Sequence, residues 1–268
     1  MTLLLLIRHA STDWVGRGLA GRLPGVGLNE QGQQEARDLA ERLRALPLDA
    51  LYTSPLERTQ ATAQALAEGR SLALSLLPGV IEVDFGSWTG QSLTDLRADP
   101  LWARVQTAPS RMRFPGGESP LEVQARAVRA VEEVLTRHPE GRVAVVSHAD
   151  VIKLLLAAYA GAALDAFQRF DVAPASVSAI AFTAGGPVLR LVNEVGALHR
   201  LEAPARPSGR PPPETFPLSS PSPYLGESPC PIPASPMTGM PWTPPPWPPW
   251  GRRVSGPSFC RSAGRGGC

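Results

Sequence analysis

The stretch Leu3-Leu4-Leu5-Leu6-Ile7-Arg8-His9-Ala10-Ser11-Thr12 is the one around which the chain is organised. Its five consecutive apolar residues, 3–7, are too few to cross a bilayer and predict a buried strand of a parallel sheet. Where that strand ends, the sequence changes to Arg8 and His9. Open α/β sheets bind ligands just beyond the carboxyl ends of their strands, so a cation and an imidazole there indicate an anion site. This stretch alone leaves open a solvated Arg8 and a structural His9.

Predicted strands and helices alternate along the first 200 residues. Further strands are expected at 48–53, 72–77 and 143–147, followed by a hairpin-like pair at 177–182 and 188–195. One helix is expected from about residue 31, after an Asn29 cap, and a second after a Ser54 cap, with Pro55 as its first residue. Two more are expected from Ser119 and over 151–160. This alternation predicts an α/β fold, a three-layer α/β/α sandwich with a mainly parallel sheet.

The composition changes near residue 200. Nineteen of the 30 prolines and all three cysteines lie from Pro204 onward. We therefore expect a domain over residues 1–200 and a disordered, Pro-rich tail over 201–268 that is locally polyproline II. The tail is expected to be a dispensable extension. The alternative is that it binds a Pro-recognition domain through an aromatic-lined groove.

Charge and apolar patterning limit the partners and the location. Six arginines and two glutamates follow Pro204, which leaves the residues before it close to neutral and without the basic footprint that nucleic acid requires. No apolar run reaches membrane-spanning length, and the N-terminus has no signal-peptide pattern. We expect a cytoplasmic protein that binds neither nucleic acid nor membrane, and its oligomeric state stays open.

Polar side chains follow three of the predicted strands. They are Arg8-His9, the segment Ser54 to Arg58, and Ser147-His148. The carboxyl ends of parallel strands meet at one edge of a sheet, so these groups should share a pocket. Two arginines and two histidines suit a dianionic phosphoryl group, because guanidinium groups bind its oxygens bidentately and offset the charge that builds up during transfer.

These residues also carry a family resemblance. Arg8-His9-Ala10-Ser11-Thr12 resembles the Arg-His-Gly-x-Thr signature of the histidine phosphatase superfamily, in its phosphoglycerate-mutase-like branch. Four more segments resemble the family's motifs in the same order: 54–58, 82–90, 115–119 and Ser147-His148. The resemblance covers roughly residues 3 to 195. Residues 19–25 together with 114–119 look most like a bacterial subgroup of phosphomutases or phosphatases.

The resemblance implies a role for each matching residue. His9 would be the nucleophile and form a phosphohistidine, which divides one difficult displacement into two easier steps. Glu82 would protonate the leaving alcohol and then deprotonate the water that releases phosphate. The equatorial oxygens would be held by Arg8, Arg58 and His148. The further substrate contacts would be Ser11, Gly21 and Ala149.

The implied reaction is hydrolysis of a small phosphorylated metabolite without a metal or a cofactor. A phosphomutase using the same histidine is the near alternative, and the short segment between Glu82 and His148 favours the phosphatase. A non-catalytic module that binds phosphorylated ligands is the distant alternative. The identity of the substrate stays open, because the varied middle of the chain would set it.

The chain departs from the family pattern at several positions. Ala10 and Ala149 stand where glycine is usual, which raises the question of whether the backbone there needs a positive φ. Val15 replaces a common asparagine that touches phosphate. Among residues outside the motifs, Trp14 and Trp88 are expected to pack in the protein. Arg111 and Arg113 would either reach a substrate anion or be solvated loop charges.

Overall fold

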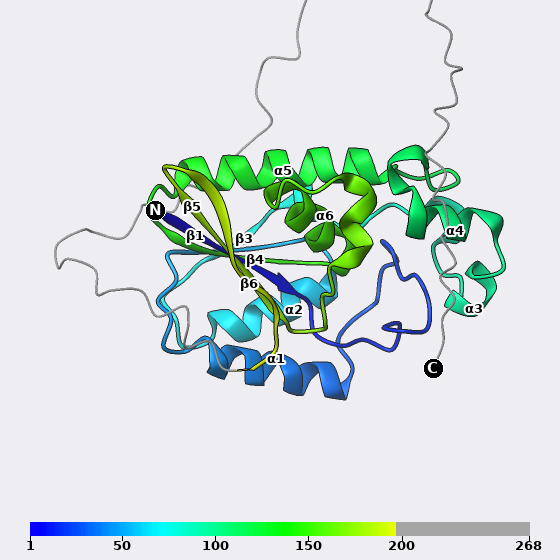
Figure 1. Ribbon diagram of the computed structural model, residues 1–268. Helices are drawn as coiled ribbons and strands as arrows, with labels where there is room; N and C mark the ends of the chain where they lie inside the picture. The colour runs from blue at the N-terminus through cyan, green and yellow to red at the C-terminus, as the bar shows by residue number, and fades with distance from the viewer. Residues whose placement is uncertain (197–268) are drawn as a thin grey trace, which may run out of the picture. The chain divides into compact units, whose positions relative to one another are not determined.

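The computed structural model describes residues 1–196 (Figure 1). The expected Pro-rich tail over 201–268, and with it the possible binding of a Pro-recognition domain, lies outside the described residues. Among those that are described, no helix combines the length and the apolar character needed to cross a membrane.

Six strands of the described chain form one sheet in the order β3-β2-β4-β1-β5-β6. The strands are β1 (Thr2–Arg8), β2 (Ala50–Thr53), β3 (Leu74–Leu76), β4 (Arg142–Ser147), β5 (Val177–Thr183) and β6 (Gly186–Glu194). Strand β4 lies between β1 and β2 and is parallel to both, and β3 is parallel to β2. Strand β5 is antiparallel to both of its neighbours, β1 and β6, so it alone runs opposite to the other five strands. The expected mainly parallel sheet is confirmed.

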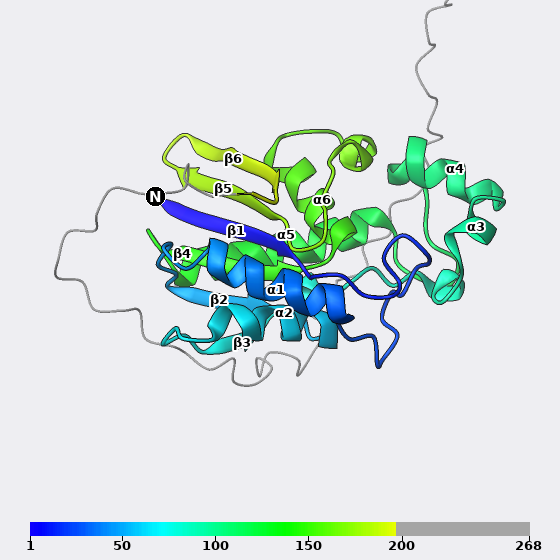
Figure 2. The same cartoon turned by 90° about the horizontal axis from the view of Figure 1, so that it is seen from below.

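Helices cover both faces of this sheet (Figure 1). Helices α1 (Glu30–Arg42) and α2 (Glu57–Ala67) lie on one face, and α5 (Pro120–Arg137) and α6 (Ala149–Tyr159) lie on the other. The shorter helices α3 (Leu93–Leu96) and α4 (Pro100–Thr107) lie beyond the end of the sheet where β1 ends (Figure 2). The predicted three-layer sandwich is therefore confirmed.

Strand β1 shows why two faces must be covered. Its side chains alternate between two apolar clusters, as the two-residue period of a strand requires. Leu4 and Leu6 pack in the cluster that includes residues of α5 and α6. Leu3, Leu5 and Ile7 pack in the cluster of α1 and α2. An unbroken apolar run in the sequence thus corresponds to a strand buried on both sides.

Of the three helix starts predicted at Asn29, Ser54 and Ser119, the first and the last are confirmed. The side chain of Asn29 accepts a hydrogen bond from the N–H of Gly32 at the start of α1. Ser119 and Glu122 form a reciprocal capping box at the start of α5. The predicted cap at Ser54 is wrong, because α2 begins at Glu57 and its first turn has no side-chain cap. The Ser54 hydroxyl is instead buried against His148, 2.8 Å from Nε2.

The loop after β1 is joined to the middle of the chain. Gly18 and Ser92 form an isolated antiparallel bridge. The N–H of Leu19 donates to the carbonyl of Gln91, and the N–H of Gly90 donates to the carbonyl of Leu19. These backbone bonds bring the loop of residues 10–28 and the segment that carries α3 and α4 to the same end of the sheet (Figure 2).

Candidate active site

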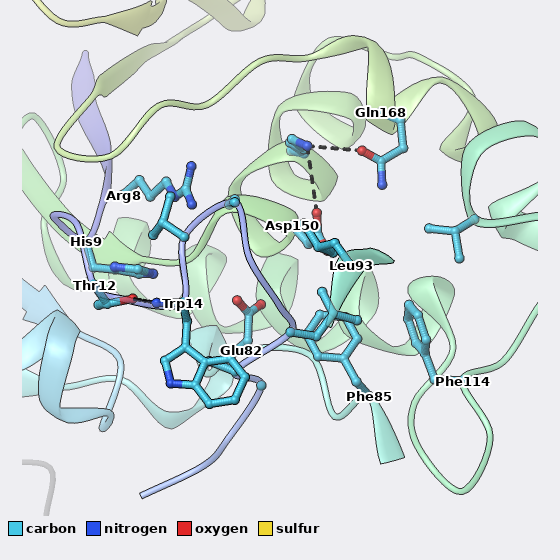
Figure 3. Close-up of a pocket in the computed structure, with 18 of the residues that line it drawn as sticks. Arg8, His9, Thr12, Trp14, Glu82, Phe85, Leu93, Phe114, Asp150 and Gln168 are labelled. Atoms are coloured by element: carbon cyan, nitrogen blue, oxygen red, sulfur yellow. Dashed lines mark hydrogen bonds and ion pairs between the residues drawn. The ribbon is translucent and has the colours of Figure 1, made fainter. Parts of the chain in front are cut away.

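The carboxyl ends of β1, β4 and β2 lie side by side and bring the predicted residues together. The rings of His9 and His148 are 5.3 Å apart between centroids, and both are buried. A cavity of about 300 Å³ opens in front of them. The predicted residues that line it are Arg8, His9, Gly21, Arg58, Glu82 and Ala149. Figure 3 shows Arg8, His9 and Glu82 around one end of this pocket.

His9 is held as a neutral imidazole with one free ring nitrogen. Its Nδ1 lies 2.8 Å from the carbonyl oxygen of Ala10. A carbonyl only accepts, so Nδ1 carries the proton and Nε2 keeps its lone pair. Burial, reinforced by the positive charges of Arg58 and Arg8, holds the pKa of His9 well below its usual value. At neutral pH this side chain can act as a nucleophile.

Each of the two arginines has a hydrogen-bond donor that no group of the described residues accepts. Arg8 donates from Nη1 to the carbonyl of Val172 at 2.7 Å, and Arg58 donates from Nη2 to the carbonyl of Gly21 at 2.8 Å. Arg8 Nε and Arg58 Nη1 are buried without a partner among the described residues. A buried donor left unpaired costs about 1–3 kcal/mol, and more when it is charged. A tetrahedral oxyanion in the pocket would satisfy both donors.

Glu82 is a carboxyl group suited to proton transfer near neutral pH. Burial, with a contribution from the charge of Asp150, raises its pKa to about 7, against the opposing effect of Arg58. The N–H of Val83 donates to Oε1 at 2.9 Å and fixes the orientation of the carboxyl. A carboxyl with a pKa close to 7 can give a proton in one step and take one in the next.

His148 lies behind the pocket and is held between Arg58 and Ser54. Arg58 Nη2 donates to Nδ1 at 3.2 Å, so Nε2 carries the proton and donates to the hydroxyl of Ser54. Burial and the charge of Arg58 lower the pKa of His148 well below its usual value. The sequence places Ser54 in a segment near this pocket but does not predict its contact with His148, because a serine before a proline is more typical of a helix cap.

Gly21 and Ala149 line the same pocket as Arg8, His9 and Arg58. Ala149 begins the 11-residue helix α6, whose N-cap His148 makes no side-chain capping bond. The first N–H groups of a helix, together with its dipole, favour an anion. Gly21 has a φ of +53°, and a Cβ there would lie 3.0 Å from Thr89 Oγ1. Ala10 and Ala149 are absent from the described residues with positive φ, so alanine is accommodated where the family has glycine.

Ser11, like His148, is a predicted contact that does not line this pocket. Its N–H donates to Glu35 Oε2 at 2.8 Å, and its hydroxyl donates to Glu35 Oε1 at 2.9 Å. Ser11 lines a separate cavity of about 340 Å³ next to α1, not the pocket of His9. The geometry therefore gives no support to Ser11 as a phosphate contact.

The outer part of the pocket was largely missed by sequence reasoning. Trp14, expected to pack in the protein, lines the pocket, whereas Trp88 is buried in the core as expected. Further lining residues come from α3, α4, α6, the loop before α5 and the segment after α6: Leu93, Trp102, Val105, Gln106, Phe114, Asp150, Lys153 and Gln168. No motif signals them, because they gather only when α3, α4 and α6 meet. Arg113 pairs with Glu122, and neither Arg111 nor Arg113 lines the pocket.

Residues 1–196 hold no group of three or more histidine, cysteine or acidic side chains placed to bind a metal ion.

Comparison with known proteins links this geometry to one family. The family model of the histidine phosphatase superfamily (branch 1) matches residues 4–195. Phosphoserine phosphatase 1 of Hydrogenobacter thermophilus is 35% identical over 182 residues, which cover 67% of this chain and 86% of that protein. A protein of Cronobacter sakazakii named as a probable phosphoglycerate mutase is 31% identical over 212 residues, 76% of this chain and 97% of its own length. The structure of YhfR from Bacillus stearothermophilus matches with a TM-score of 0.68 and 32% identity, over 75% of this chain and all of that one.

Proposed function

The chain belongs to the histidine phosphatase superfamily, and we propose that it hydrolyses small phosphomonoesters through a phosphohistidine formed at His9. One observation carries the proposal. Two buried guanidinium donors, Arg8 Nε and Arg58 Nη1, have no hydrogen-bond partner within residues 1–196, and they lie next to the imidazole of His9, whose Nε2 is free. That combination supports a site for a phosphoryl group next to a nucleophile.

In the first step, the lone pair of His9 Nε2 attacks phosphorus in line with the ester oxygen. The P–N bond forms as the P–O bond breaks. Arg8 and Arg58 bind the equatorial oxygens and offset the negative charge of the transition state. Glu82, whose pKa of about 7 leaves a large part of it protonated, gives its proton to the leaving alcohol.

In the second step, water takes the place of the alcohol. Glu82 is now a carboxylate and accepts a proton from the water that attacks phosphorus. The P–N bond breaks, inorganic phosphate leaves, and His9 returns to the neutral form, with Nδ1–H still donating to the Ala10 carbonyl. His148, held by Arg58 and Ser54, maintains the shape of the phosphate site.

The names of the relatives support a small phosphorylated metabolite as substrate, since they are a phosphoserine phosphatase and a phosphoglycerate mutase. We assign the chemistry to a catalytic domain of residues 1–200, because the pocket is lined by residues between Arg8 and Gln168. Metabolites of this kind are cytoplasmic, and the proposal places the enzyme there.

A mutase would use the same histidine and return the phosphoryl group to its substrate instead of to water. The relative named as a mutase keeps this reading open as the second candidate. Measuring free phosphate against interconversion of 2- and 3-phosphoglycerate separates the two. The phosphatase proposal expects release of phosphate to exceed isomerisation, and dominant isomerisation would overturn it.

Hydrolysis of p-nitrophenyl phosphate in EDTA, by wild type and by His9→Ala, tests the proposal. We expect turnover by wild type and a loss of about 10³-fold or more in kcat for the variant, because the nucleophile is gone. Turnover that survives in His9→Ala would contradict the mechanism. A protein that binds phosphate tightly but hydrolyses nothing in either form would be a binding module.

A further inference from the structure

The pocket has a second charged end, and it is formed by the only lysine in the chain. Of the 26 lysine and arginine residues in the sequence, Lys153 is the one lysine and the other 25 are arginine. Lys153 lies on α6 and lines the same pocket as His9 and Arg58. None of the catalytic steps above uses it.

The ammonium group of Lys153 is directed toward the start of α6, where Ala149 lines the same pocket. Lys153 follows Ala149 by four residues, so the two share one face of α6. Side chains on a helix lean toward its N-terminus, which directs that of Lys153 back along α6. Accordingly, Nζ lies 3.8 Å from Oδ1 of Asp150, the residue directly after Ala149. The positive charge thus lies beside the first turn of α6.

Lys153 has more hydrogen-bond donors than the described residues accept. Its ammonium can donate three hydrogen bonds. Gln168 Oε1 accepts one at 3.0 Å, and the 3.8 Å to Asp150 is too long for a second. The side chain is 18% exposed, so water has limited access to the remaining donors.

The surroundings make this charge available to a ligand. Trp102, Val105 and Leu93 form apolar wall in the same pocket. A charge pair partly removed from water is stronger and less screened by salt than one on an open surface. The natural partner for a compact, half-buried ammonium is an anionic oxygen, and the ligand's phosphate is already assigned to Arg8 and Arg58.

We propose that Lys153 binds a carboxylate of the substrate, so that the site selects small phosphomonoesters that carry a carboxylate a few bonds from the ester oxygen. This inference rests on the proposed function, because it concerns the same pocket. The phosphate and the carboxylate of such a substrate would be a short distance apart, because the Lys153 ammonium lies beside the turn of α6 that begins at Ala149. The competing explanation is an ordinary helix-surface pair of Lys153 with Asp150, which would leave substrate choice unaffected.

Two ligands that differ only by the carboxylate test the inference. Phosphoserine is phosphoethanolamine with a carboxylate added. Each would be measured as a competitive inhibitor of p-nitrophenyl phosphate hydrolysis, which gives an inhibition constant whether or not the ligand is itself hydrolysed. The proteins are wild type, Lys153→Met, which keeps the length of the side chain without its charge, and Lys153→Arg. The matched control is Arg104→Met, which removes an exposed positive charge from α4 outside the pocket.

We expect wild type to bind phosphoserine at least about tenfold more tightly than phosphoethanolamine, as for a partly desolvated charge pair. Lys153→Met should bring that ratio close to one, Lys153→Arg should restore part of it, and Arg104→Met should leave it unchanged. A ratio that is the same in Lys153→Met and wild type would overturn the inference, as would a wild-type ratio near one.

Failure of the inference is distinguishable from failure of the proposed function. If p-nitrophenyl phosphate is hydrolysed by wild type and not by His9→Ala, the phosphatase proposal stands whatever the inhibitor ratio. If hydrolysis is absent from wild type or persists in His9→Ala, the proposed function fails, and the inference fails with it.

Discussion

At Glu82, two physical effects act in opposite directions on one carboxyl group. Burial and the charge of Asp150 favour the neutral acid, while Arg58, the Val83 N–H and Arg8 favour the carboxylate. The result is a pKa of about 7 instead of the usual 4.5. The first step needs the protonated form, so kcat/KM should fall as the pH rises through this pKa.

Asp150→Asn should move that fall to lower pH. The variant removes the negative charge that raises the pKa of Glu82, so the carboxyl loses its proton earlier. The pH dependence of kcat/KM for p-nitrophenyl phosphate measures the shift, and wild type assayed with the same substrate accounts for substrate ionisation. Asp165→Asn, at a surface carboxylate outside the pocket, serves as the control. A descending limb that stays in place in Asp150→Asn would contradict the assignment of Glu82.

Individual residues were predictable where a strand end fixes their position. Arg8, His9 and His148 directly follow or end a buried strand, and they meet because β1 and β4 are neighbours. The hydrogen-bond partners of Ser11 and Ser54 were not predictable, because the direction of a serine side chain depends on which groups lie near it in the fold. Glu35 accepts a hydrogen bond from the Ser11 hydroxyl. The Ser54 hydroxyl is hydrogen-bonded to His148 and does not cap a helix. These partners are distant in sequence, so no local pattern reveals them.

Among the elements, α1 positions the loop that carries the nucleophile. Glu35 accepts both the N–H and the hydroxyl of Ser11. Gly32 lets the helix approach the same residue closely, since a Cβ there would lie 1.9 Å from the Ser11 carbonyl oxygen. Ser11 is two residues from His9, so this contact helps to set the position of the imidazole.

Gly32→Ala should therefore lower both activity and stability. Alanine is the better helix former by about 1 kcal/mol, so a loss of stability would come from the contact with Ser11 and not from the helix itself. We expect kcat to fall about tenfold or more, since small displacements of catalytic groups are costly, and the melting temperature to fall as well. Gln33→Ala, on the exposed side of α1, is the control. Wild-type kcat and melting temperature in Gly32→Ala would show that the close approach does not matter.

The regular elements were predicted because their apolar residues form recognisable patterns. The helices on the faces of the sheet show a helical period, as in α5, and the central strand β1 is an unbroken apolar run. The segment around α3 and α4 follows none. Trp102 and Phe114 pack against Trp88, which precedes α3 in the chain. Their environment is therefore set by tertiary contact and not by local spacing.

On the scale of the whole molecule, the site lowers the stability of the fold. A buried carboxyl whose pKa is raised from 4.5 to about 7 binds more protons in the folded state than in the unfolded state between these values. The unfolding free energy therefore falls as the pH rises through this window. Below about pH 4.5, where Glu82 is protonated in both states, its ionisation costs the fold nothing.

Glu82→Gln should remove this loss of unfolding free energy at high pH, and it should abolish most of the activity. At pH 8 the variant should be more stable than wild type by about 1–3 kcal/mol, or several degrees in melting temperature, and the difference should shrink toward pH 5. Thermal unfolding at the two pH values measures it. Glu68→Gln, at an exposed position, is the control. Equal melting temperatures for Glu82→Gln and wild type at pH 8 would mean that Glu82 is not a destabilised buried acid.

The most direct test of the central claim is to trap the phosphoenzyme. Wild type and His9→Ala would be mixed with excess p-nitrophenyl phosphate, quenched within milliseconds in alkali, digested and analysed by mass spectrometry. We predict one added phosphoryl group on the peptide that contains His9, stable in base, lost in acid and absent from His9→Ala. A phosphoryl group on any other side chain, or turnover by wild type with none found at His9, would contradict the mechanism.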